Sequence, residues 1–312
     1  MCEGLSEIFR RKRRQIYALI LNTEGYFMKF QFLGTAAAEG WPAVFCKCGH
    51  CLRAAKAGGK NIRTRSQAII NDELLIDLPP DTYLHKLQYG LDLSAVKYLL
   101  VTHCHMDHFY PQELSVRGSC YSPVMESPEL HIYCAAETKE LFDRCTRGEI
   151  DDESKCALHW HILKAFETVQ VGSYTVTSLP ANHMTQDGAH EPFVYHIVDG
   201  DGVSVYYLHD SGYYSKEVWE YFKCQRAADF ISFDTTTGGV PTNKYWGHLG
   251  AHEVLEVADE MKKFGLIDEK TVCVMNHFSH NGEFLHEELE ALAKPKGFKV
   301  AYDGMTVELT AR

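Results

Sequence analysis

The sequence lacks a hydrophobic run long enough to suggest a membrane protein. Near its N-terminus a basic cluster at residues 10–14 is followed by an apolar stretch at residues 16–21. This stretch is too short for a membrane span or for the hydrophobic part of a secretory signal. We therefore expect no association with membranes and a cytoplasmic location.

The sequence also lacks an excess of positive charge. It contains 31 Lys and Arg against 42 Asp and Glu, which gives a formal net charge of -11. Proteins that bind nucleic acid by neutralising phosphates need a broad basic face, so we do not expect nucleic acid to be a partner. Small anionic substrates remain compatible with this charge, because bound divalent cations would supply positive charge locally.

Linkers, internal repeats and low-complexity tracts are absent as well. A chain of 312 residues with 45% hydrophobic and 23% charged residues can bury a full core. Strand and helix patterns alternate from residue 28 onward, which predicts one layered α/β domain over residues 28–312. Residues 1–27 are expected to be a basic extension that is disordered, loosely helical or upstream of the native start. The oligomeric state stays open, and a homodimer is compatible with the sequence.

Residues that can bind metal follow several of the predicted strands. Hydrophobic patterns predict strands at 29–33, 68–76, 96–101, 131–134, 175–179, 193–198, 203–208, 230–233, 271–275 and 299–302. They predict helices at 107–114, 136–144, 215–223, 249–264 and 286–294. Asp77, His183, Asp210 and His277 each come just after a strand pattern. Four such residues in this position favour a shared site over four separate structural roles.

The most informative segment is His103-Cys-His105-Met-Asp107-His108, which follows the apolar pattern of residues 96–101. At the end of a strand, residues two apart point the same way, so His103 and His105 can bind one metal ion. Asp107 and His108 turn into the next element and can reach a second ion. Four ligand-type residues within six positions rarely arise for packing reasons, so the segment predicts a pair of metal ions.

The chain has eleven cysteines, and without a secretory signal we expect reduced thiols rather than disulfides. Cys46-Lys-Cys48-Gly-His-Cys51 places three thiols within six residues, a spacing that suits tetrahedral zinc but lacks a fourth ligand. His280 can supply that ligand if the start of the domain packs beside the loop that carries it. Buried free thiols are the alternative.

Taken together, these segments resemble the metallo-β-lactamase superfamily over residues 28–309. The resemblance implies an αββα sandwich of two mixed β-sheets flanked by helices. It also implies two sets of metal ligands with a shared carboxylate: His103, His105 and His183 for one ion, Asp107, His108 and His277 for the other, and Asp210 bridging both. Asp77 would accept the free N–H of a metal-bound histidine or orient the loop.

The bridging position separates subclasses of this superfamily. The common zinc lactamases have a cysteine near the position of Asp210, so the aspartate favours the two-metal hydrolases over β-lactam hydrolysis. The resemblance implies two divalent ions, Zn or Mn, with a hydroxide shared between them as the nucleophile. Phosphoesters are the substrates that this chemistry favours.

The cysteine loop narrows the resemblance. A Cys-x-Cys-x2-Cys loop after the first strand and a His277-Phe-Ser-His280 motif are similar to those of the PhnP-like phosphodiesterases. This similarity implies that Cys46, Cys48, Cys51 and His280 form a structural zinc site. Such a site would hold His277 in position rather than take part in the chemistry.

One further segment, Trp246-Gly-His248-Leu-Gly-Ala-His-Glu253, resembles the region in which phosphodiesterases of this superfamily keep a histidine near the phosphate. His248 and Asp107 are our candidates for catalytic residues. His248 would hydrogen-bond a phosphoryl oxygen or protonate the leaving alkoxide, with helix capping as the alternative. Tyr245 and Trp246 are candidates to stack on a base or sugar, with ordinary packing as the alternative.

The sequence therefore predicts a two-metal phosphodiesterase that acts on small nucleotide or cyclic sugar phosphate esters. An RNA-processing nuclease of the RNase Z type is the alternative enzyme, weakened by the acidic charge balance. A non-catalytic binding protein of the PqqB type is the alternative from another class. It predicts a degraded ligand set, whereas every ligand position is filled in this chain.

Overall fold

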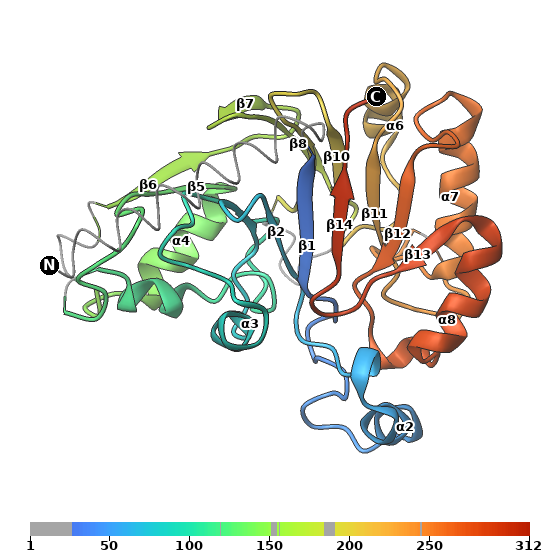
Figure 1. Cartoon of the computed structure of the whole chain (residues 1–312), viewed down its shortest axis with the longest axis horizontal. Helices are drawn as coiled ribbons and strands as arrows, with labels where there is room; N and C mark the ends of the chain where they lie inside the picture. The colour runs from blue at the N-terminus through green and yellow to red at the C-terminus, as the bar shows by residue number, and fades with distance from the viewer. Residues whose placement is uncertain (1–26, 119, 151–154, 156, 184–190, 244) are drawn as a thin grey trace, which may run out of the picture.

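Two seven-stranded β-sheets pack face to face, with helices on their outer faces (Figure 1). The computed structural model describes residues 27–118, 120–150, 155, 157–183, 191–243 and 245–312. This architecture confirms the expected αββα sandwich. Residues 1–26 lie outside the described residues, so the N-terminal extension and its boundary stay predictions. None of the helices formed by the described residues is long and apolar enough to span a membrane.

Both sheets are mixed, and the first combines the early strands with the last strand of the chain. In spatial order the first sheet consists of β14 (Thr306–Leu309), β1 (Met28–Gly34), β2 (Gln67–Ile70), β3 (Leu74–Ile76), β4 (Tyr98–Leu100), β5 (Leu130–Cys134) and β6 (Leu158–Ile162). The second consists of β13 (Phe298–Val300), β12 (Val272–Asn276), β11 (Phe230–Asp234), β10 (Ser204–Leu208), β9 (Phe193–Val198), β8 (Tyr174–Pro180) and β7 (Thr168–Val171).

Helices cover the outer faces and the ends of the sandwich (Figure 1). The α-helices are α2 (Gly49–Ala57), α3 (Thr82–Tyr89), α4 (Ala136–Cys145), α6 (Lys216–Lys223), α7 (Ala251–Lys263) and α8 (His286–Ala293). The short 3-10 helices are η1 (Gly59–Asn61), η2 (Pro111–Val116), η3 (His280–Gly282) and η4 (Lys294–Lys296). Helix α6 begins where the sequence predicts it, because the Ser215 hydroxyl accepts a hydrogen bond from the Val218 amide.

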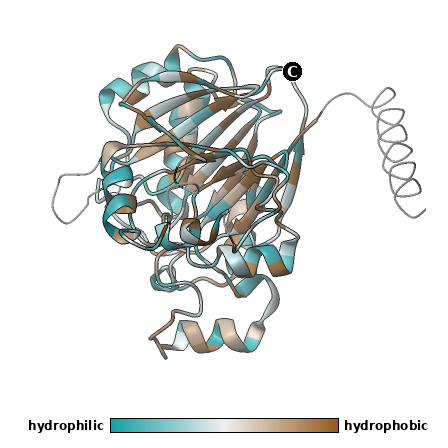
Figure 2. Ribbon diagram, turned by 90° about the vertical axis from the view of Figure 1, so that its left-hand side faces the viewer, coloured by the Kyte–Doolittle hydropathy of each residue, from teal (hydrophilic) through white to brown (hydrophobic). Residues whose placement is uncertain are grey.

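Alternation along the strands distributes apolar side chains between layers. In β10, Val205 and Tyr207 face the core between the sheets, whereas Tyr206 and Leu208 face the layer under α6 and α7. All five residues of β10 are buried for this reason. Figure 2 shows brown, hydrophobic colouring along the strands of the interior and mixed colouring, with hydrophilic segments, on the outer helices.

Two predicted elements are wrong. The single strand expected at residues 68–76 is a hairpin of β2 and β3, because Asn71 and Asp72 adopt positive φ angles of 50° and 59° and reverse the chain. The helix expected at residues 107–114 is absent, and residues 106–108 form a turn before η2. Pro111 lacks an N–H and disfavours a helical conformation at Tyr110, which has φ -109° and ψ 84°.

The sheet order brings the ends of several strands to one edge. Strands β10, β11 and β12 are parallel neighbours, so Asp210, Asp234 and His277 all lie where these strands end. In the first sheet, β3 and β4 are also parallel, and Asp77 and His103 follow them. The polar residues predicted at strand ends therefore meet although they are far apart in sequence.

Candidate metal centre

Three residues of this edge have an unusual backbone conformation. Asp77, Asp210 and His277 have φ angles of 66°, 49° and 63°. A residue other than glycine adopts this left-handed region at a cost of about 1–3 kcal/mol and keeps it only where its surroundings fix it. The Asp77 amide donates to the Leu100 carbonyl at 2.8 Å, which fixes one of the three turns. The chain thus turns sharply after β3, β10 and β12, and each turn carries a polar side chain of the site.

The first group of possible ligands consists of His103, His105, His183 and Asp210, whose ligand atoms all lie within 4.8 Å of one another. Nδ1 of His105 lies 2.9 Å from Nε2 of His103 and 3.1 Å from Nε2 of His183. The Asp210 carboxylate oxygen Oδ2 lies 3.3 Å from His103 Nε2 and 3.6 Å from His183 Nε2. Three imidazole nitrogens thus converge beside one carboxylate.

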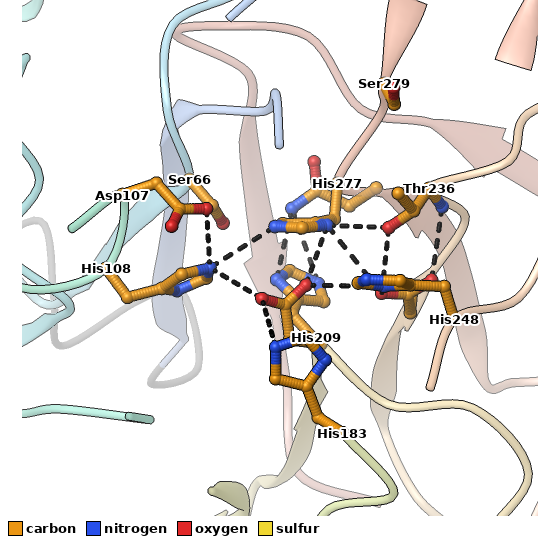
Figure 3. A network of polar contacts seen from close by, with 12 residues as sticks. Ser66, Asp107, His108, His183, His209, Thr236, His248, His277 and Ser279 are labelled. Atoms are coloured by element: carbon orange, nitrogen blue, oxygen red, sulfur yellow. Dashed lines mark hydrogen bonds and ion pairs between the residues drawn. The ribbon is translucent and has the colours of Figure 1, made fainter. Parts of the chain in front are cut away.

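The second group consists of Asp107, His108, Asp210 and His277, and all four residues are buried. Nε2 of His108 lies 3.1 Å from Asp210 Oδ2 and 3.3 Å from both Asp107 Oδ2 and His277 Nε2. Figure 3 shows Asp107 and His108 on one side of this network and His277 on the other. Asp210 belongs to both groups, which is the bridging position that the resemblance implies for it.

Electrostatics keep the shared carboxylate ionised. Burial alone would raise the pKa of Asp210, but His277, His108 and His183 around it hold that pKa well below its ordinary value. Burial and the neighbouring His108 lower the pKa of His103 to about 3, which leaves its ring neutral at physiological pH. A carboxylate and a neutral imidazole are the protonation states that bind a divalent ion.

The side chains fit a pair of divalent metal ions. His183 Nδ1 is a buried nitrogen without a hydrogen-bond partner among the described residues. Asp210 Oδ1 lies 3.0 Å from Nδ1 of His277 and 3.6 Å from Nδ1 of His248. A buried carboxylate enclosed by imidazole nitrogens in this way suits a divalent cation. The donor set of imidazole nitrogens and carboxylate oxygens suits Zn, Mn or Fe.

Asp77 supports the second group from behind. Its carboxylate lies 2.7 Å from Nδ1 of His108, and both side chains are fully buried. The Thr102 amide donates to the same carboxylate at 2.8 Å, and the Thr102 hydroxyl donates at 3.0 Å. Accepting the Nδ1 proton of His108 leaves Nε2 of this ring as the ligand atom, which is the role predicted for Asp77.

His248 lies beside the second group rather than at a helix terminus. Its Nδ1 is 3.1 Å from Asp234 Oδ2 and 3.6 Å from Asp210 Oδ1, and α7 starts after its N-cap Gly250. Burial disfavours the charged ring, but the carboxylates of Asp234, Asp210 and Asp107 outweigh it and raise the pKa of His248 to about 9. The side chain is 30% exposed, so the ring can face both Asp234 and a bound substrate.

The supporting roles of Asp234 and Thr236 were not predicted from the sequence. Asp234 accepts hydrogen bonds from the Leu249 amide and from Thr236, and the Thr236 hydroxyl lies 2.8 Å from Nδ1 of His277. Asp234 therefore orients His248 and, through Thr236, contacts His277. The signal was present in the sequence, because Asp234 ends a strand pattern as the predicted ligands do.

A buried histidine beside Asp210 was also missed. The His209 ring is fully buried, and its Nε2 lies 2.6 Å from the Ser232 hydroxyl. Burial and the nearby His277 hold the pKa of His209 well below its ordinary value. This neutral ring is held by Ser232 of β11 and packs behind Asp210. Its position next to a predicted ligand was the only sequence signal for it.

The cysteine loop forms a separate group. Cys46, Cys48, Cys51 and His280 have ligand atoms within 4.8 Å of one another, and Cys48 Sγ lies 3.4 Å from His280 Nδ1. Hydrogen bonds from the Cys51 amide and from His280 lower the pKa of the Cys48 thiol to about 6. Three thiols and one imidazole match a structural zinc site. The structure thus brings together all four predicted residues.

Asp303 supports the loop that carries His277. Its carboxylate accepts hydrogen bonds of 2.6 Å from the Thr35 hydroxyl, the Thr64 hydroxyl and the Thr64 amide. The Thr35 carbonyl in turn accepts the amide of Phe278, the residue after His277. The Tyr302-Asp-Gly segment near the C-terminus therefore helps to fix the loop that carries His277.

Tyr245 and Trp246, the aromatic residues predicted near the active-site mouth, are exposed. Their side chains are 63% and 74% exposed, and the ring of Tyr245 meets that of Tyr213 edge to face at 5.6 Å. They precede His248 in the same loop. Packing in the core is thus excluded for both residues, and their rings are available for contact with a ligand.

Comparison with known proteins identifies the domain. The sequence matches the β-lactamase superfamily domain over residues 73–277. No curated protein sequence matches this chain.

Solved structures with a similar fold come from different functional groups. A diphosphatase of the PhnP family is 19% identical, with 92% of this chain and 99% of that chain covered and a TM-score of 0.70. Zinc-bound PqqB from Methylobacterium extorquens is 19% identical, with 89% and 99% covered and a TM-score of 0.67. The short form of human tRNase Z is 17% identical, with 91% and 100% covered and a TM-score of 0.61. At these identities the likeness establishes the fold alone.

Proposed function

This chain belongs to the β-lactamase superfamily, and from that premise we propose that it is a two-metal-ion hydrolase of small phosphodiesters. The observation that carries this proposal is the position of Asp210. Its oxygen Oδ2 lies 3.3 Å from His103 of the first group and 3.1 Å from His108 of the second. Its other oxygen, Oδ1, lies 3.0 Å from His277 and 3.6 Å from His248. A shared carboxylate with a histidine beside it supports hydrolysis better than it supports metal storage or a structural role.

Divalent ions such as Zn or Mn, held by His103, His105, His183, Asp107, His108, His277 and Asp210, would supply Lewis-acid charge and activate water. The chain's own residues orient the reaction. Asp77 fixes His108, and Thr236 contacts His277, so these two rings are held before substrate binds.

His248 is the proposed general acid. Its Nδ1 faces Asp234 and Asp210, which favours the protonated ring and leaves Nε2 to face a substrate. Proton donation from Nε2 to the leaving oxygen would avoid release of an unstable alkoxide. Asp107 is proposed to act as a ligand of the second ion and to favour the charged form of His248. The same arrangement suits a phosphate ester better than a β-lactam, since a poor alkoxide leaving group benefits most from a proton donor.

A structural zinc in the group of Cys46, Cys48, Cys51 and His280 completes the proposed complement of about three metal ions. Nε2 of His280 lies 3.7 Å from the Glu39 carboxylate, which also accepts a hydrogen bond from Ser279 at 2.5 Å. This partner supports zinc binding, because a metal-bound imidazole usually gives its second nitrogen to a carboxylate.

The substrates that we propose are small nucleotide or cyclic sugar phosphate esters. The net charge of -11 disfavours long polyanions such as RNA. Tyr245 and Trp246 are exposed in the loop before His248 and offer rings on which a base or sugar can stack. A small ester can reach both these rings and the ligand groups without a basic arm.

Hydrolysis of bis-p-nitrophenyl phosphate tests the proposal. Protein purified without chelator is analysed for metal content, and wild type is compared with Asp210→Ala and with Asp201→Ala as a control on an exposed turn. We expect about three or more metal ions per chain and a loss of activity of about 10³-fold or more in Asp210→Ala only. Absence of phosphodiester hydrolysis after Zn or Mn is added back would reject the enzyme. Cleavage of a tRNA precursor in preference to small diesters would instead favour the RNase Z type.

A further inference from the structure

A second cluster of histidines lies on the first sheet, away from the candidate metal centre. His131 is on β5, and His159 and His161 are on the edge strand β6, whose position at the end of the sheet is visible in Figure 1. The two strands are parallel, and His131 lies directly opposite His159. The metal centre lies beyond the ends of strands, whereas His131 and His159 are the second residues of β5 and β6.

The cluster continues an apolar face of the sheet. Tyr133 belongs to the core between the two sheets, and His131, two residues earlier, points to the same side of β5. His161 stacks on Tyr133 with ring centroids 4.3 Å apart and an interplanar angle of 11°. The rings of His131 and His159 stack at 4.7 Å. Three imidazoles therefore occupy positions where alternation predicts apolar residues.

The polar atoms of the cluster are arranged as ligands. Ligand atoms of Glu129, His131 and His159 lie within 4.8 Å of one another. Nε2 of His159 is buried and has no hydrogen-bond partner among the described residues, and the Glu129 carboxylate lies 4.0 Å away, too far for a hydrogen bond. An unpaired buried nitrogen that faces a carboxylate and a second imidazole lacks a partner that a cation would supply.

His161 gives the cluster a supporting residue. Its Nε2 lies 3.1 Å from Nδ1 of His131. If His131 donates this proton, its Nε2 is left as the ligand atom, which is the usual arrangement of a metal-bound histidine with a hydrogen-bonded neighbour. The stacking of His161 on Tyr133 fixes the acceptor in place.

We propose that Glu129, His131 and His159 bind a divalent transition-metal ion at the edge of the first sheet, with His161 as a positioning residue. Two imidazoles and one carboxylate suit Zn, Cu or Ni, whereas Mg and Ca prefer oxygen ligands alone. Three protein ligands leave a coordination position for water or a small ligand. His131 and His159 are half-buried and Glu129 is exposed, so an ion can reach the site from solvent.

Zinc binding to matched variants tests this site. Wild type, the double variant His131→Gln/His159→Gln and the control His252→Gln, an exposed histidine on α7, are dialysed against micromolar free Zn²⁺. Bound zinc is then measured by elemental analysis. We expect wild type and His252→Gln to bind about one zinc ion per chain more than the double variant.

A single variant serves as a control for misfolding of the double variant. Glu129→Gln changes an exposed side chain and should weaken binding of the extra zinc about tenfold. Equal zinc content in all variants, or an extra zinc ion that appears only at millimolar concentration, would overturn the site. Phosphodiester hydrolysis, measured in the same samples, should be equal in all of them. Absence of phosphodiester hydrolysis in all samples would reject the proposed function. The difference in zinc content between the variants would not be affected by that result.

Discussion

The contact between Asp77 and His108 gives the sharpest prediction for the metal centre. In Asp77→Asn the side chain keeps its shape, and its oxygen can still accept the Thr102 amide. The carboxylate oxygen 2.7 Å from His108 Nδ1, in a fully buried pair, is replaced by an amide nitrogen. A hydrogen bond to a charged group contributes about 1.5–3 kcal/mol. Since about 1.4 kcal/mol is tenfold, we expect metal to bind the His108 group about 10- to 100-fold more weakly.

Competition with a chromophoric chelator measures this affinity for wild type, Asp77→Asn and the exposed-turn control Asp201→Asn. Urea unfolding of the chelated proteins gives their stability without metal. The reasoning requires the metal affinity to fall in Asp77→Asn while the control matches wild type. Unchanged affinity in Asp77→Asn, or a loss of stability with no loss of affinity, would refute it.

Three further outcomes follow from the same contacts. His248→Gln should slow hydrolysis of alkyl phosphodiesters by about 10²–10⁴-fold. Hydrolysis of p-nitrophenyl esters should slow much less, because nitrophenolate leaves without a proton. Equal losses in kcat for the two kinds of ester would contradict the role of His248 as general acid. Cys48→Ala should lose about one zinc ion per chain and lower the melting temperature, and an unchanged zinc content would exclude the structural site. Asp303→Ala removes three hydrogen bonds of 2.6 Å to a partly buried carboxylate, so urea unfolding should show a loss of about 3 kcal/mol. A loss below about 1 kcal/mol would show that the two threonines find other partners.

The ligand-type residues of the site could be predicted because their chemistry is visible in short segments. His103 and His105 stand at strand spacing, and Asp210 and His277 each follow an apolar run. The structure brings these residues together because parallel strands end at a common edge. Elements without a strong local pattern were missed. Strand β6 contains two histidines among five residues, and β7 is an exposed edge strand of four, so neither shows the apolar alternation of a core strand.

The supporting residues could not be predicted, because their roles depend on long-range contacts. Asp234 was visible as an ordinary strand-end residue, and only the packing of the loop before α7 places His248 beside it. Asp303 is 268 residues from Thr35, and no local pattern links them. Ligand identity is thus set by local spacing, whereas the orientation of each ligand depends on the fold.

The proposed structural zinc and the metal centre share one short segment, and this gives the cysteine loop a function. His277 and His280 are separated by Phe278 and Ser279, and the Phe278 amide and carbonyl are hydrogen-bonded to Thr35 and Ala37 on the chain after β1. His277 has a positive φ, a conformation that persists only where both flanks are fixed. Asn276 accepts the Thr235 amide and so fixes the flank before His277. The Thr35 contact of Phe278 and a zinc-bound His280 would fix the flank after it. Loss of the zinc would therefore loosen the His277 ring before it unfolded the domain.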